Sequence, residues 1–86
     1  MRLSREARQA QIISVGKTIA IRDGLAAVTP ERIAQNGPQD DARITVATIR
    51  RYFHTRESLW VAIARECAGH KLIACEAKLL GIRLSD

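Results

Sequence analysis

Four serine or threonine residues each precede a stretch in which apolar residues recur every three or four positions. They are Ser4, Thr29, Thr45 and Thr55. A hydroxyl oxygen at such a position can accept a hydrogen bond from a backbone N–H of the first helical turn. The signal is strongest at Thr29, because Pro30 suits the first helical position and Glu31 places negative charge at the positive end of the helix dipole. No segment shows the alternation typical of a β-strand, so the pattern predicts an all-α fold.

The apolar spacing also predicts which residues face the core. The expected inward residues are Ala7, Ala10, Ile13, Ile19 and Ala20 in a first helix that ends at Asp23-Gly24; Leu25 and Val28 after it; Ile33 and Ala34 in a short helix at 30–35; Ile44, Ile49 and Phe53 around a third helix; and Leu59, Trp60, Ile63, Ala64 and Cys67 in a fourth. The polar stretch before Ile44 lacks apolar periodicity and is expected to be a loop. Gly69 is expected to weaken or break the fourth helix before a last apolar segment.

Size and charge limit the classes of function. The 86 residues suffice for one small core, and 14 Lys and Arg against 9 Asp and Glu give a net charge of +5. This balance favours a polyanionic partner, and nucleic acid ranks above a membrane surface because no run approaches the roughly 18 apolar residues of a spanning helix. The N-terminus has no signal-peptide apolar block, so we expect a cytoplasmic protein. Aromatic residues make up 3% of the chain, which argues against an RNA-binding sheet that stacks bases.

The cysteines and histidines do not predict catalytic or metal chemistry. Cys67, His70 and Cys75 follow a C-x2-H-x4-C spacing, but on a helix Cys67 and Cys75 lie two turns apart, too far to share one ion with His70, and a fourth ligand is missing. We therefore expect no metal and no cofactor, and two reduced, buried cysteines. The pattern places no serine or cysteine nucleophile beside His54, which is expected near a phosphate in a turn. The chain is not expected to be an enzyme.

A short capped helix, a connection and a second short helix with small and basic outward residues together predict a helix-turn-helix. The second of these helices would enter the major groove of DNA. Val46 and Ala47 are small enough to let its backbone approach the bases, and the Thr45 and Thr48 hydroxyls can reach phosphates or base edges.

Arg50 and Arg51 are long enough to reach guanine edges or phosphates, but they lie about 100° apart on a helix. One is therefore expected to read a base and the other to contact the backbone. The local cations are Arg43, Arg50, Arg51, His54 and Arg56, with Glu57 as the one acid among them. Tyr52 has two open interpretations: stacking in the core, or offering its hydroxyl to a phosphate.

The segments TPERIA and TVATIRRYFHTRESLW resemble the N-terminal DNA-binding domain of TetR-type repressors. The corresponding residues are Ile33-Ala34, Thr45, Thr48, Ile49, Tyr52-Phe53, Thr55, Arg56-Glu57 and Leu59. The resemblance implies that Arg56 replaces a phosphate-binding lysine, that Thr29 and Thr45 touch phosphates, and that arginines of the N-terminus flank the duplex. The full set of expected DNA contacts is Arg2, Arg5, Arg8, Thr29, Arg43, Thr45, Val46, Ala47, Thr48, Arg50, Arg51, Tyr52, His54, Thr55 and Arg56.

Three features differ from the family pattern. The connection between Ala34 and Thr45 is longer than the usual tight turn, and Arg50 stands where a tyrosine is common. The family's large ligand-binding and dimerisation domain has no counterpart after Glu66, so no small-molecule effector is expected.

The segment 67–86 carries more apolar residues than a small core can cover, which favours self-association. The expected dimer contacts are Leu72, Ile73, Cys75, Leu79 and Leu80; in the alternative, a fifth helix folds back on its own domain. We thus expect a homeodomain-like three-helix core with a helix-turn-helix in 1–66, and one or two dimerising helices in 67–86.

The expected function is a dimeric, sequence-specific repressor that binds an inverted-repeat operator in double-stranded DNA and blocks promoter access. The main alternative is a protein-interaction module, an antitoxin or adaptor, whose basic face meets an acidic partner. Nonspecific DNA compaction is a third possibility.

Overall fold

The computed structural model describes residues 4–40, 43–67 and 69–82, and all regular structure in these ranges is helical. The elements are α1 (Arg5–Asp23), the 3₁₀ turn η1 (Leu25–Ala27), α2 (Pro30–Asn36), α3 (Val46–Tyr52), α4 (Arg56–Glu66) and α5 (Lys71–Leu79). The predicted all-α fold is confirmed. The second helix extends one residue beyond the predicted 30–35, and Gly69 lies in the break between α4 and α5.

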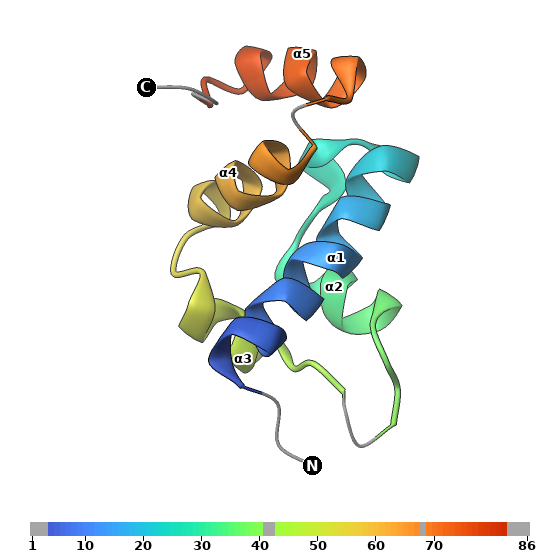
Figure 1. Cartoon of the computed structure of the whole chain (residues 1–86), viewed down its shortest axis with the longest axis vertical. Coiled ribbons are helices and arrows are strands. Elements are labelled where there is room, and N and C mark those ends of the chain that lie inside the picture. The colour runs from blue at the N-terminus through green and yellow to red at the C-terminus, as the bar shows by residue number, and fades with distance from the viewer. Residues whose placement is uncertain (1–3, 41–42, 68, 83–86) are drawn as a thin grey trace.

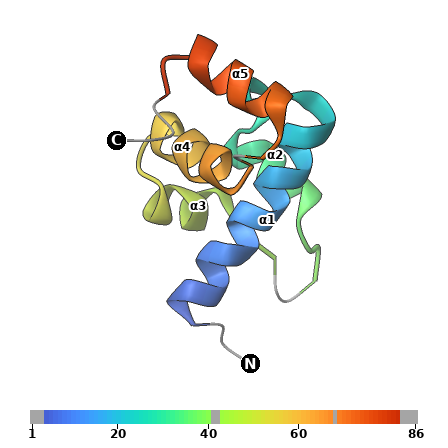
Figure 2. The same ribbon diagram turned by 45° about the horizontal axis from the view of Figure 1, so that its top comes forward.

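The helices form one packed unit of 38 × 25 × 20 Å, in which α1 contacts α2, η1 and α4. Helix α2 packs on α3, whereas α5 packs on α4 and η1. Figure 1 shows α3 and α5 at opposite ends of the long axis, and Figure 2 shows the first turns of α1 extending past the other helices. The fold therefore has an α3 end and an α5 end.

The predicted hydroxyl caps begin the first four α-helices. Ser4 accepts a hydrogen bond from the Ala7 N–H at 3.1 Å, and Thr29 accepts one from the Arg32 N–H at 3.1 Å. Thr45 and Thr55 cap α3 and α4 in the same way, and at α4 the Ser58 hydroxyl also accepts from the Thr55 N–H. Helix α5 begins after His70, which makes no side-chain cap. Local sequence thus sets where α1 to α4 begin.

The core confirms most of the predicted inward residues, including Leu25, Val28, Ile33, Ile44, Ile49, Leu59 and Ile63, all of which are buried. The first helix agrees only in its second half: Ile19 and Ala20 are buried as predicted, but Ala7 and Ala10 are exposed, while Ile12 and Gly16 are buried. The first turns of α1 extend beyond the core, and the buried stripe begins only at Ile12. Gly16 lies against α4 so closely that an added Cβ would sit 2.3 Å from Ile63 Cδ1.

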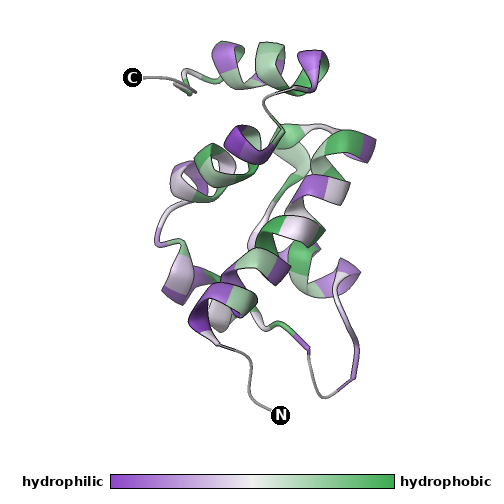
Figure 3. Ribbon diagram, in the orientation of Figure 1, coloured by the Kyte–Doolittle hydropathy of each residue, from purple (hydrophilic) through white to green (hydrophobic). Residues whose placement is uncertain are grey.

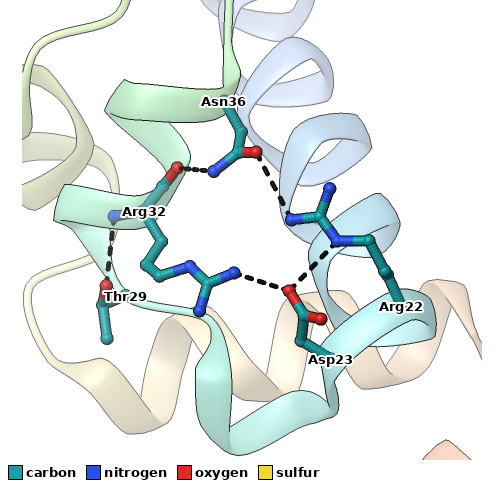
Figure 4. Close-up of polar contacts among 5 residues, drawn as sticks. All are labelled: Arg22, Asp23, Thr29, Arg32 and Asn36. Atoms are coloured by element: carbon teal, nitrogen blue, oxygen red, sulfur yellow. Dashed lines mark hydrogen bonds and ion pairs between the residues drawn. The ribbon is translucent and has the colours of Figure 1, made fainter.

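A polar network fixes α2 against the end of α1 (Figure 4). The Asp23 carboxylate accepts hydrogen bonds from Arg22 Nε and Arg32 Nη2, while Asn36 accepts from Arg22 and donates to the Arg32 carbonyl. The hydrogen bond from Arg22, together with that from Arg32, lowers the pKa of Asp23. Arg22 and Arg32 therefore help to hold α2 against α1.

The long connection after α2 is tied to the helix that precedes it. The Gln39 side-chain amide donates to the carbonyls of Ala34, Gln35 and Gly37 at 3.1, 3.1 and 2.9 Å. These are carbonyls that the end of a helix leaves without an intrahelical partner. Residues 37–40 and 43–45 are non-helical, as predicted, and Ile44 returns the chain to the core.

Helix α5 packs on its own domain through Ile73 and Ala77, which are buried. The Glu76 carboxylate accepts hydrogen bonds from the Leu25 and Ala26 N–H groups of η1. Gly24, at φ +100°, lies beside this carboxylate, and a Cβ there would meet Glu76 Oε2 at 3.3 Å. The inner face of the fifth helix therefore folds back on its own domain, as the alternative prediction stated, and its outer face stays exposed.

Two predictions for this end of the chain are corrected. Ile73, expected at a dimer contact, is 2% exposed because it faces the domain's own core. Cys75, expected to be buried, is exposed on the outer side of α5, whereas Cys67 is buried and its burial raises the pKa of the thiol. Leu72 and Leu79 remain 77% and 88% exposed.

Candidate nucleic-acid interface

The predicted DNA contacts gather at the α3 end. Arg5, Arg43, Thr45, Ala47, Arg50, Arg51, His54, Thr55 and Arg56 are exposed; Arg8, Thr29, Val46, Thr48 and Tyr52 are partly buried; Arg2 lies outside the described residues. The inward residues Ile49 and Phe53 are buried, which fixes the face that α3 turns outward. Figure 3 shows mostly hydrophilic colouring in the first turns of α1 beside α3.

The two threonines at the start of α3 are joined. Thr45 Oγ1 accepts from the Thr48 N–H at 3.2 Å and lies 2.9 Å from Thr48 Oγ1. Because one hydroxyl donates to the other, the pair presents one remaining O–H to an outside acceptor. Beside this pair, the side chains of Val46 and Ala47 are small, so they protrude little from the start of α3.

A hollow of about 240 Å³ opens between the starts of α2 and α4 and the end of α3. It is lined by Thr29, Pro30, Glu31, Arg50, Phe53, His54, Thr55, Arg56 and Leu59. The start of α4 contributes backbone N–H groups and the positive end of its dipole. Glu31 is paired with Arg50, so Arg56 and the start of α4 are the groups of the hollow that suit a phosphate oxygen more than a cation.

Aromatic rings hold two arginines that flank α3. The Arg56 guanidinium lies 5.2 Å from the centre of the Trp60 ring, and the Arg5 guanidinium lies 5.6 Å from that of Tyr52. Trp60 is itself anchored, since its Nε1–H donates to the Val28 carbonyl at 2.8 Å. A ring face attracts a guanidinium without taking up its N–H donors, so both arginines keep donors for an outside acceptor.

Tyr52 and Trp60 each contact both the core and an arginine. Tyr52 packs partly against the core, which agrees with its core interpretation, while its ring faces Arg5. Trp60 was predicted only as a core residue and is partly buried. Its contact with Arg56 could have been found from the sequence, because residues four apart on a helix are neighbours.

The arginines of the molecule therefore fall into different chemical settings. Arg22 and Arg32 are bound to Asp23, whereas Arg50 has an ion pair of 3.4 Å with Glu31. Arg51 has no ion pair within the described part of the chain. Sequence reasoning gave Glu31 only a role at the helix dipole, because its pairing with Arg50 spans 19 positions.

Metal-binding clusters and membrane-spanning helices are both absent from the described residues. Within the described ranges, no three His, Cys, Asp or Glu side chains are grouped so as to hold a metal ion. None of the helices described is both long and apolar enough to span a bilayer. Comparison of the chain with protein-family models, curated proteins and solved structures gave no match, so no family is assigned to it.

Proposed function

We propose that this protein is a sequence-specific repressor of the TetR-like helix-turn-helix type, which binds an inverted repeat in double-stranded DNA as a dimer and blocks promoter access. The observation that carries the proposal is the α3 end, where a short capped helix with exposed arginines lies beside a hollow lined by Arg50, His54 and Arg56. The resemblance of the segments around Thr29 and Thr45 to TetR-type domains supports it.

The dimensions of α3 suit the major groove. With its side chains an α-helix is about 10–12 Å across, and the groove is roughly 12 Å wide, so the seven-residue α3 fits in it. Ile49 and Phe53 point into the core, so the outward side chains, which include Ala47, Arg50 and Arg51, are the ones offered to DNA. Packing on α2 holds this helix from behind.

The hollow supplies backbone contacts on one side of α3. In this proposal Arg56 and the start of α4 hold a phosphate, with His54 beside it, while Arg5 contacts the backbone from the first turn of α1. Each phosphate bound by a cation releases counterions, so affinity depends steeply on salt. Backbone contacts of this kind set register and orientation but carry no sequence information.

The α5 end supports dimerisation because it lies away from the DNA-binding face. Leu72 and Leu79 expose most of their hydrocarbon, and Cys75 lies between them on the same exposed side. A two-fold pair joined there leaves both α3 helices uncovered, and in this proposal the two half-sites of the operator lie one helical turn, about 34 Å, or a somewhat larger helical-phase spacing apart.

A duplex titration over a range of salt concentrations tests the function. The logarithm of affinity should fall linearly with the logarithm of salt, by about 0.9 for each phosphate contact. One inverted repeat should also outcompete bulk DNA by about a thousandfold or more. A flat salt response contradicts the proposal and favours a protein-interaction module, an antitoxin or adaptor with an acidic partner. A steep response without sequence preference indicates DNA compaction.

A further inference from the structure

Arg50 has a carboxylate partner that its neighbour lacks. Its Nη2 lies 3.4 Å from Oε1 of Glu31, which reaches across the hollow from the first turn of α2. The two side chains are 65% and 55% exposed, and an ion pair this open adds little to folding stability. The main effect of this ion pair is therefore on the position of the Arg50 guanidinium group.

Orientation of the guanidinium matters more for a base contact than for a phosphate contact. A guanine is recognised by two parallel N–H donors that meet its O6 and N7 in the major groove, so the arginine must present its plane correctly. A phosphate can also accept two N–H donors of one guanidinium, but its several oxygens accept them over a wider range of orientations. A guanidinium has five N–H donors in one plane, so Glu31 can accept from Nη2 of Arg50 and leave another edge of the group free.

The negative charge of Glu31 also favours a base contact for Arg50 over a phosphate contact. A carboxylate beside a phosphate-binding arginine weakens that contact, because it repels the phosphate. Beside a neutral base edge it carries no such penalty, and it limits the rotamers of the arginine. Arg51 lies about 100° further round α3 and has no carboxylate partner among the described residues, which suits a backbone contact.

We propose that Glu31 is a positioning residue that orients Arg50 to read a guanine in each half-site, while Arg51 contacts the phosphate backbone. This inference rests on the proposed function and adds to it one base pair of the operator and the residue that reads it. Glu31 contributes to sequence preference rather than to total affinity.

The test is selection of duplexes from a randomised inverted-repeat pool, followed by affinity measurements on the selected site and its single-base changes. The set consists of the wild-type chain, Arg50→Ala, Arg51→Ala, Glu31→Gln and the double variant Glu31→Gln/Arg50→Ala. Arg50→Ala should lower the preference for one G·C pair per half-site by roughly 5- to 150-fold. Glu31→Gln should lower the same preference by about threefold or more, and the double variant should match Arg50→Ala.

A merely repulsive role for Glu31 gives a different result. In that case Glu31→Gln strengthens binding to every duplex equally and leaves the base preference unchanged, which overturns the inference. Loss of the G·C preference in Arg51→Ala, but not in Arg50→Ala, overturns it as well. A wild-type chain that selects no sequence overturns the proposed function itself, before any variant is measured. Because both side chains are exposed, thermal melting should match the wild type in all variants.

Discussion

The two ends of this molecule expose opposite chemistry. At the α3 end, Ile49 and Phe53 are buried, and the outward side chains are small, hydroxylated or cationic. At the α5 end, Leu72 and Leu79 lie open although Ile73 and Ala77 are buried. Helices α1 to α4 begin at hydroxyl caps, whereas α5 has no side-chain cap and is held by long-range contacts. One end is built by local signals and exposes charge; the other depends on tertiary contacts and exposes hydrocarbon.

The largest effect should come from removing the carboxylate that holds α5. Glu76→Ala leaves the Leu25 and Ala26 N–H groups without their charged acceptor, which should lower the free energy of unfolding by about 3 kcal/mol. Urea denaturation followed by circular dichroism measures the change. Glu66→Ala, at an exposed carboxylate of α4, is the control and should stay close to the wild type. Equal stability of the two variants would mean that Glu76 does not anchor this end.

At the α3 end the corresponding change acts on binding rather than on folding. Arg56→Ala removes a guanidinium held over Trp60, and should weaken binding to every duplex by about 2 kcal/mol. The salt slope should fall by about 0.9, because one phosphate contact is lost, while the order of preferred sequences is kept. The matched control is Arg65→Ala, at an exposed arginine in the last turn of the same helix. An unchanged slope would remove Arg56 from the interface.

A smaller effect separates the ring of Trp60 from its hydrogen bond. Trp60→Phe keeps an aromatic face for Arg56 but leaves the Val28 carbonyl without its donor. The free energy of unfolding should fall by about 1 kcal/mol, with the salt slope of duplex binding nearly unchanged. Loss of the slope together with the stability would show that the ring must be anchored to present Arg56.

The smallest effect concerns Asp23, in the last turn of α1. Its pKa in the folded protein is lowered, chiefly by the hydrogen bond from Arg22. Its stabilising contribution is therefore present above the unfolded value near 3.9 and is lost as the pH falls through the lower folded value. Asp23→Asn should be less stable than the wild type at neutral pH, and the difference should shrink on acidification. A gap between the two denaturation midpoints that stays constant down to pH 2 contradicts this.

Sequence reasoning succeeded where a few neighbouring residues decide the outcome. The caps at Thr29, Thr45 and Thr55 and the buried positions of Ile44 and Ile49 follow from local pattern. The inward face of α1 was placed wrongly near its start, because how far a helix extends past the core is set by packing rather than by its own spacing.

Long-range polar contacts left no trace that a pattern could detect. The bond from Glu76 to the Leu25 N–H spans 51 positions, and the pair of Glu31 with Arg50 joins two helices. Neither follows from propensity or period. The presence of the candidate DNA-binding side chains at one end of the fold was thus predictable, while the partners that hold individual side chains were not.

Gly16 has a consequence beyond this molecule. The contact between α1 and α4 leaves room there for a hydrogen atom only, since an added methyl would overlap Ile63. A homologous chain with the same helix spacing must keep a glycine at this place, shrink the residue opposite it, or turn that side chain to another rotamer. The position can therefore serve as a diagnostic signature when distant sequences are sorted by whether they share this architecture.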